Sequence, residues 1–228
     1  DAYHGDFNAI KLNLNQCIAA VNGLVTEAGR LTTAAVDGKL ATRGDVSRFQ
    51  GDFAKIVQGV NNTLDAVIGP LNVAARYVDR ISKGDIPEKI MDEYKGDFNQ
   101  IKNNLNQCID AVNGLIAEAQ MITKAAVEGK LSTRGNAAKF QGGFAQIVQG
   151  VNDTLDAVIG PLNVAATYVD RISKGDIPDK ITDAYNGDFN TIKNNLNKCI
   201  EAVNRLVAEV GRLATATVEG LLATRGDI

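Results

Sequence analysis

The sequence predicts an all-α protein built from tandem helical repeats, and three observations predict it. Apolar residues make up 45% of the 228 residues, yet aromatic residues make up 5% and Trp is absent. Small aliphatic side chains suit closely packed helices, whereas a globular core of this length usually relies on large rings. An internal repeat of 91 residues and a heptad spacing of apolar residues point the same way.

The 91-residue repeat contains a fainter half-repeat. Residues 51–90 and 142–181 differ at only five positions. A motif that begins Gly-Asp-Phe, or once Gly-Gly-Phe, starts at five glycines, alternately 46 and 45 residues apart: Gly5, Gly51, Gly96, Gly142 and Gly187. The chain therefore consists of two alternating classes of unit.

The first class of unit predicts a long, regular helix. From Phe98 to Ala126 the apolar positions alternate in steps of three and four, which is the a/d seam of a coiled coil. The same seam starts at Phe7 and at Phe189. About 30 residues at 1.5 Å each predict a helix of about 45 Å, which cannot bury its apolar stripe alone.

The second class of unit carries an irregularity in its seam. From Phe53 to Ile81 two steps of four occur in succession, a stutter that locally unwinds a supercoil. Pro70 lies just beyond it, and Pro161 repeats that position. Because proline removes a backbone hydrogen bond, we expect either a kink or a boundary between two segments there.

Glycine and aspartate mark the expected ends of the helices. We expect each helix to end at a glycine in the left-handed conformation, namely Gly38, Gly84, Gly129, Gly175 or Gly220. We expect the next helix to begin at an aspartate N-cap, namely Asp6, Asp52, Asp97 or Asp188. The connectors of about a dozen residues permit either an antiparallel or a parallel return, and the spacing does not choose between them.

The connectors carry a resemblance to the HAMP domain, in a tandem array. Gly84, Ile86 and Ile90 resemble the glycine and the two spaced hydrophobic residues of a HAMP connector, and Gly175, Ile177 and Ile181 repeat them. Pro70 and Pro161 match the proline of the first HAMP helix, and Phe98 and Phe189 match the start of the second. The Asn of the second helix recurs at Asn15, Asn61, Asn106, Asn152 and Asn197.

Two kinds of connector follow from this resemblance. We call residues 83–97 and 174–188 the Ile-Pro connectors, and they match the family well. We call residues 38–51 and 129–142 the Arg-Gly connectors; they diverge, because Gly44 stands where the second hydrophobic residue is expected. We expect Phe49 and Phe140 to substitute for it.

The resemblance also implies an architecture. It implies an elongated rod of HAMP repeats in which each domain is a parallel four-helix coiled coil formed by a homodimer. The expected domains are 1–19 (partial), 20–65, 66–111, 112–156, 157–202 and 203–228 (partial). In the parallel dimer, Cys17, Cys108 and Cys199, which share one seam position, are expected to approach their symmetry mates.

The sequence gives little support for catalysis or ligand binding. His4 is the only histidine and its repeat counterparts are Lys95 and Asn186, so we interpret it as a solvated residue. Each Cys stands alone in its unit, which favours core packing over a metal site. We interpret the Asn-rich segment 103–106 as solvent-facing, with one Asn able to specify register. We therefore predict no enzyme activity, cofactor or metal.

The remaining composition bears on partners and location. Charge is nearly balanced at 24 basic and 27 acidic residues, which argues against nucleic-acid binding. No apolar run is long enough to cross a bilayer, no signal peptide opens the chain, and sparse thiols suit a reducing compartment, so we expect a cytoplasmic segment, with a membrane tether elsewhere in the full protein left open.

Two functional hypotheses remain. The resemblance implies a relay that passes conformational change between the sensor and output modules of a bacterial chemoreceptor or sensor histidine kinase. The alternative is a passive coiled-coil rod or a segment of a filament, since a rod needs only length and the repeats are nearly identical.

Overall fold

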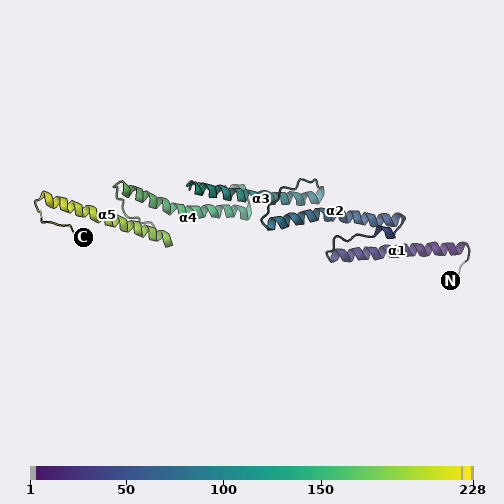
Figure 1. Ribbon diagram of the computed structural model, residues 1–228. Coiled ribbons are helices and arrows are strands. Elements are labelled where there is room, and N and C mark those ends of the chain that lie inside the picture. Colours follow the sequence, from purple (N-terminus) through teal and green to yellow (C-terminus); the bar gives the residue numbers. More distant parts are fainter. Residues whose placement is uncertain (1–3, 222, 227–228) are drawn as a thin grey trace. The chain divides into compact units, whose positions relative to one another are not determined.

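The computed structural model describes residues 4–221 and 223–226, and this part of the chain is helical without a strand (Figure 1). The elements are α1 (Asp6–Val36), η1 (Val46–Arg48), α2 (Gly51–Ser82), α3 (Gly96–Val127), η2 (Ala137–Lys139), α4 (Gly142–Ser173) and α5 (Gly187–Val218). The five α-helices have 31 or 32 residues. The predicted all-α class and the predicted helix lengths are confirmed.

The expected glycines terminate the helices. Gly38, Gly84, Gly129, Gly175 and Gly220 have φ between 73° and 78°. At the end of α1 the Gly38 N–H donates to Ala35 O at 3.1 Å and the Lys39 N–H donates to Ala34 O at 2.8 Å, which satisfies two otherwise unpaired carbonyls. A side chain with a Cβ would strain this conformation, so the glycines fix where the connectors begin.

The aspartates do not cap the helix starts as the sequence predicted. The N-cap residues of α1, α2 and α5 are Gly5, Gln50 and Asn186. At none of these three does a side chain accept a hydrogen bond from the backbone N–H groups of the first turn. The predicted caps lie inside the first turn instead, where a carboxylate interacts favourably with the helix dipole: Asp6, Asp52, Asp97 and Asp188. Compared with the prediction, α1 begins one residue earlier and α2, α3 and α5 begin two residues earlier. The glycine before each aspartate adopts a φ of 54° to 59°.

The prolines do not divide their helices. Pro70 lies inside α2 and Pro161 lies inside α4, and both helices continue for three more turns. A segment boundary at these positions was one of two expectations, and it is wrong.

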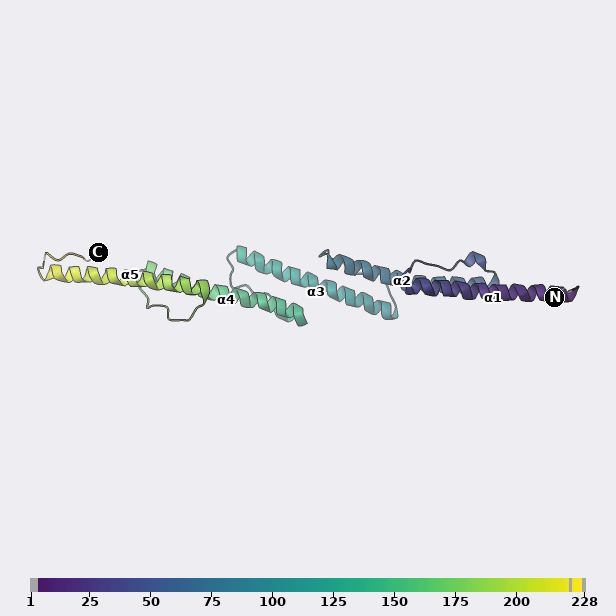
Figure 2. The ribbon, with the colours of Figure 1, turned by 90° about the horizontal axis from the view of Figure 1, so that it is seen from below.

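The chain divides into two units, Asp1–Asn113 and Gly114–Ile228, with the boundary inside α3. Within each unit, neighbouring helices run parallel, and the connector returns along them (Figures 1 and 2). In the second unit Gly114 lies against Phe140, just before α4, and Ala126 lines a pocket with Ile159, deep in α4. Residues that advance along α3 therefore meet residues that advance along α4. The structure selects the parallel return that spacing left open.

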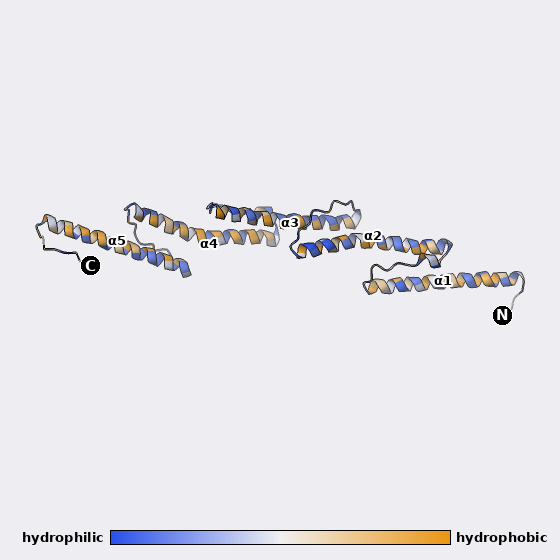
Figure 3. Cartoon of the chain, viewed as in Figure 1, coloured by the Kyte–Doolittle hydropathy of each residue, from blue (hydrophilic) through white to orange (hydrophobic). Residues whose placement is uncertain are grey.

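Most of the buried residues of the helices lie beside the predicted seam rather than on it, with Ile122 of α3 as a buried seam residue. In α2 the buried residues are Val57, Asn61 and Ile68. The seam residues one position earlier are exposed to 49%, 40% and 41%: Ile56, Val60 and Val67. Figure 3 shows the apolar residues distributed along all five helices. A single chain thus buries one stripe in each helix pair and leaves much of the heptad seam open.

Candidate functional site

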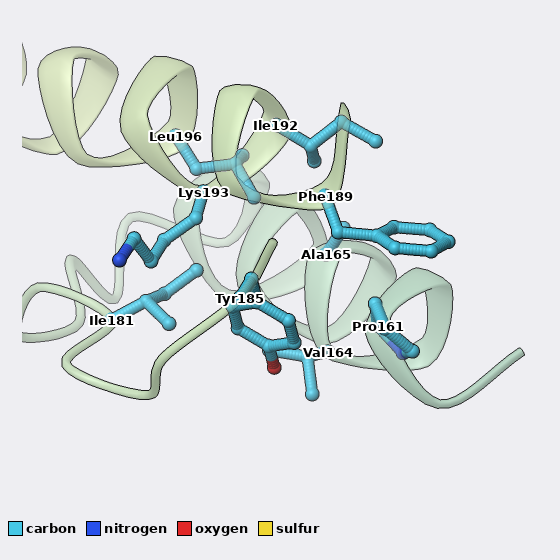
Figure 4. Close-up of a pocket in the computed structure, with 9 residues that line it drawn as sticks. All are labelled: Pro161, Val164, Ala165, Ile181, Tyr185, Phe189, Ile192, Lys193 and Leu196. Carbon is cyan, nitrogen blue, oxygen red and sulfur yellow. The ribbon is translucent and has the colours of Figure 1, made fainter. Parts of the chain in front are cut away.

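Each Ile-Pro connector closes over an apolar pocket between two helices. In the second unit, α4 contributes Pro161, Val164 and Ala165, the connector contributes Ile181 and Tyr185, and α5 contributes Phe189, Ile192, Lys193 and Leu196 (Figure 4). The first unit has the same pocket, shifted by 91 residues and lined by Pro70, Val73, Ala74, Ile90, Tyr94, Phe98, Ile101, Lys102 and Leu105.

The sequence singled out five positions in each 91-residue repeat, and the structure brings three of them together in the pocket. Pro70, Ile90 and Phe98 line the first pocket, and their counterparts Pro161, Ile181 and Phe189 line the second. Gly84 and Gly175 instead end the preceding helices, and Ile86 and Ile177 lie half-buried on the connector outside the pocket. The sequence analysis missed Tyr94 and Tyr185, whose only signal is an aromatic residue repeated at 91 residues.

An asparagine fastens each Ile-Pro connector to the following helix. Asn106 Oδ1 accepts from Ile90 N at 2.7 Å, and Asn106 Nδ2 donates to Ile90 O at 3.0 Å. Asn197 does the same for Ile181 at 2.8 and 3.0 Å. Asn106 is half-buried while Asn103 and Asn104 are exposed. The interpretation of residues 103–106 as solvent-facing is therefore wrong for Asn106. Its amide, in place of water, forms the hydrogen bonds of the Ile90 backbone, which belongs to no helix or sheet.

The Arg-Gly connectors carry the same clamp on a glycine. Asn61 Oδ1 accepts from Gly44 N at 2.7 Å and its Nδ2 donates to Gly44 O at 2.9 Å. Asn152 holds Gly135 with two bonds of 2.8 Å. Gly44 and Gly135 therefore occupy the position of the second hydrophobic residue, Ile90 or Ile181.

Valines from the following helix fill the space that the missing isoleucine side chain leaves. A Cβ on Gly44 would lie 2.6 Å from Val57 Cγ1, and one on Gly135 would lie 2.7 Å from Val148 Cγ1. Val57 and Val148 are 3% and 2% exposed. The expectation that Phe49 and Phe140 substitute is wrong: Phe49 packs against Gly23 and Phe140 against Gly114, on the preceding helix.

In each of the four connectors, an ion pair also joins the connector to the following helix. The basic partner lies next to the clamped residue and the acidic partner lies one turn beyond the clamping Asn. The pairs are Arg43–Asp65, Lys89–Asp110, Arg134–Asp156 and Lys180–Glu201. Hydrogen bonding from the Lys180 ammonium holds the pKa of Glu201 below its ordinary value. Because these pairs are partly exposed, we expect them to align the connector more than to stabilise it.

The site is built from apolar packing, asparagine hydrogen bonds and ion pairs. Among the described residues no cluster of three or more His, Cys, Asp or Glu side chains is placed to hold a metal ion. His4 is exposed, as are Cys17, Cys108 and Cys199. In the described part of the chain no helix has the length and apolar character needed to span a bilayer.

Comparison with known proteins agrees with this geometry. Residues 48–114 and 139–205 each match the HAMP domain, and the two matches cover more than half of the chain. No solved structure matches the chain. HAMP domains are non-catalytic linkers that relay signals in receptors and kinases. Two matches in tandem, over helices that run parallel and are joined by clamped connectors, lead to one conclusion: the chain belongs to the HAMP domain family.

Proposed function

We propose that this chain is the poly-HAMP segment of a bacterial chemoreceptor or sensor kinase, and that it passes conformational change from an input module to an output module through helix repacking. The observation that carries the proposal is that one uninterrupted helix contacts two successive connectors. The first part of α2 clamps one connector through Asn61, and its second part lines the pocket closed by Ile90 of the next. A shift of α2 therefore changes the packing at both connectors at once.

We further propose that the relay is a parallel homodimer on the cytoplasmic side of the membrane. The exposed seam supports this, because seam side chains such as Ile10 at 61% and Leu14 at 58% exposure would stay in contact with water in a single chain. A heptad seam left open on helices that already pair on another face is suited to a second copy of the same chain, with its symmetry axis parallel to the helices.

Cysteine cross-linking tests the dimer. Cys108 lies near the middle of the chain and would meet its mate in either orientation, so variants that keep only Cys17 or only Cys199 decide. We expect light scattering to give a dimer and mild oxidation to cross-link both variants within it. A monomer, or a dimer in which neither variant cross-links, would contradict the parallel seam.

A connector substitution tests the relay in the full-length protein. Ile86→Asp places a carboxylate at a half-buried connector position, whereas Met91→Asp places one on the same connector where the side chain is 84% exposed. We expect Ile86→Asp to change the balance of output states with and without stimulus, and Met91→Asp to leave it unchanged.

A passive rod is the alternative that this experiment separates. The near identity of residues 51–90 and 142–181 supports a spacer, since length alone would then matter. A rod predicts that Ile86→Asp lowers the melting temperature and leaves the output unaltered, and that a coiled coil of equal length replaces the segment without loss.

A further inference from the structure

Two buried glutamates lie in the helices that precede the Arg-Gly connectors. Glu27 in α1 is 2% exposed and Glu118 in α3 is 5% exposed. A buried carboxylate is costly unless hydrogen bonds and an opposite charge satisfy it. Neither the pockets nor the asparagine clamps involve these side chains, so their burial needs another explanation.

Both carboxylates bind the backbone of the connector. Glu27 Oε1 accepts from Asp45 N at 2.9 Å, and Glu118 Oε2 accepts from Asn136 N at 3.1 Å. These N–H groups directly follow Gly44 and Gly135, which the asparagines of the next helix hold. Two adjacent residues of each Arg-Gly connector are thus tied to both of the helices that flank it.

The two repeats neutralise the carboxylate with different side chains. Arg30 donates to both oxygens of Glu27, at 2.6 and 3.1 Å, with Arg48 at 3.5 Å. In the second repeat Met121 replaces Arg30, and Lys139, the counterpart of Arg48, lies 2.6 Å from Glu118. The counter-charge has moved while the bond to the connector is kept, so that bond is the common feature.

The Ile-Pro connectors lack this tie. Val73 and Val164 lie eleven residues before the terminal glycine, as Glu27 and Glu118 do, and they line the apolar pockets. In the described structure the bonds of residues 86–95 to helices go to α3, through Asn106, Asp110 and Lys102. Next to the terminal glycine, Arg80 of α2 binds Asp85 at 2.6 and 3.1 Å, and Arg171 of α4 binds Asp176 at 2.7 and 3.2 Å. Beyond these exposed aspartates, the connectors are fastened to the following helix and packed against the preceding one.

We infer that Glu27 and Glu118 act as latches that lock the Arg-Gly connectors to both flanking helices, so that the relative motion of helix and connector is confined to the alternating Ile-Pro domains. The latch is a property of the folded chain alone. Its consequence for signal relay rests on the proposed function, in which rigid and movable domains would then alternate along the array.

Hydrogen exchange measured by mass spectrometry on the full chain tests the latch. We expect amides of residues 134–141 to exchange more slowly than those of residues 180–187 in the same molecule. Glu118→Val installs the residue that Val164 already provides at the equivalent place. We expect it to speed exchange at residues 134–141 by about tenfold, which is the loss of one charge-assisted hydrogen bond, and to leave residues 180–187 unchanged.

Glu128→Val is the matched control. It removes an ion-paired carboxylate from the start of the same connector, where Glu128 pairs with Lys130, without touching Asn136. We expect it to leave exchange at residues 134–141 as in the unmodified chain. Equal exchange in the two connectors of that chain, no effect of Glu118→Val, or acceleration throughout the molecule would each overturn the latch.

Output of the full-length protein separates the two inferences. If Glu118→Val accelerates local exchange and changes the output balance, both the latch and its part in the relay are supported. If exchange accelerates and output is unchanged, the latch is supported and its part in the relay is overturned.

Discussion

Gly135→Ala tests how the Arg-Gly connectors are packed. The new Cβ would lie 2.7 Å from Val148 Cγ1 and 3.1 Å from Ile122 Cδ1, both closer than a normal contact. The backbone cannot easily retreat, because Asn152 holds the N–H and the C=O of Gly135 at 2.8 Å. Overpacking of this kind costs about 1–3 kcal/mol, and the φ of Gly135 is not positive, so the cost comes from packing rather than backbone strain.

Denaturant unfolding at fixed protein concentration measures this cost, since an oligomer's stability depends on concentration. Val148→Ala removes the clashing methyl group, so in a double-mutant cycle Gly135→Ala should cost less in the Val148→Ala background than alone. Gly143→Ala is the control: nothing lies within 4 Å of its Cβ, and Asp52 stands at this position in the other repeat. The packing explanation fails if Gly135→Ala and Gly143→Ala lower the free energy of unfolding equally. It also fails if the effects of Gly135→Ala and Val148→Ala are additive.

Three further predictions follow from the site. Asn152→Ala leaves the buried N–H and C=O of Gly135 unpaired and should lower the free energy of unfolding by about 2–5 kcal/mol, whereas Asn104→Ala at an exposed position should change little; comparable losses in the two variants would contradict the clamp. Ile90→Ala at a side chain that is 5% exposed should cost about 2–5 kcal/mol, and a loss below 1 kcal/mol would show that Ile90 does not anchor its connector. Hydrogen bonds from Arg30 and from the Asp45 N–H lower the pKa of Glu27 from 4.5 to about 2. The ionised Glu27 therefore contributes its full stabilisation above pH 4.5, at no more than about 3 kcal/mol, and this contribution is lost as the pH falls toward 2. When unfolding is measured as a function of pH, Glu27→Gln should lose less free energy of unfolding in acid than the unmodified chain. Identical profiles would refute the assignment.

The sequence by itself determined the helices and their C-terminal ends. Heptad steps from Phe98 to Ala126 are a local property of the chain, and they predicted α3 to within a few residues. Gly38 and its counterparts predicted the C-termini, because the left-handed conformation is a requirement of single residues. The matched motif of Gly84, Ile86 and Ile90 was sufficient to indicate the family.

The tertiary structure decided which face of each helix is buried and how the connectors are held. The period of a heptad is local, but the choice between adjacent stripes depends on the neighbouring helix, so Ile109 is 1% exposed while Cys108 beside it is exposed. The clamps of Asn106 and Asn61 join residues 16 and 17 apart through backbone groups that no side-chain pattern reveals. The parallel return and the buried Glu27 likewise depend on contacts between separate helices, which is why spacing alone could not determine them.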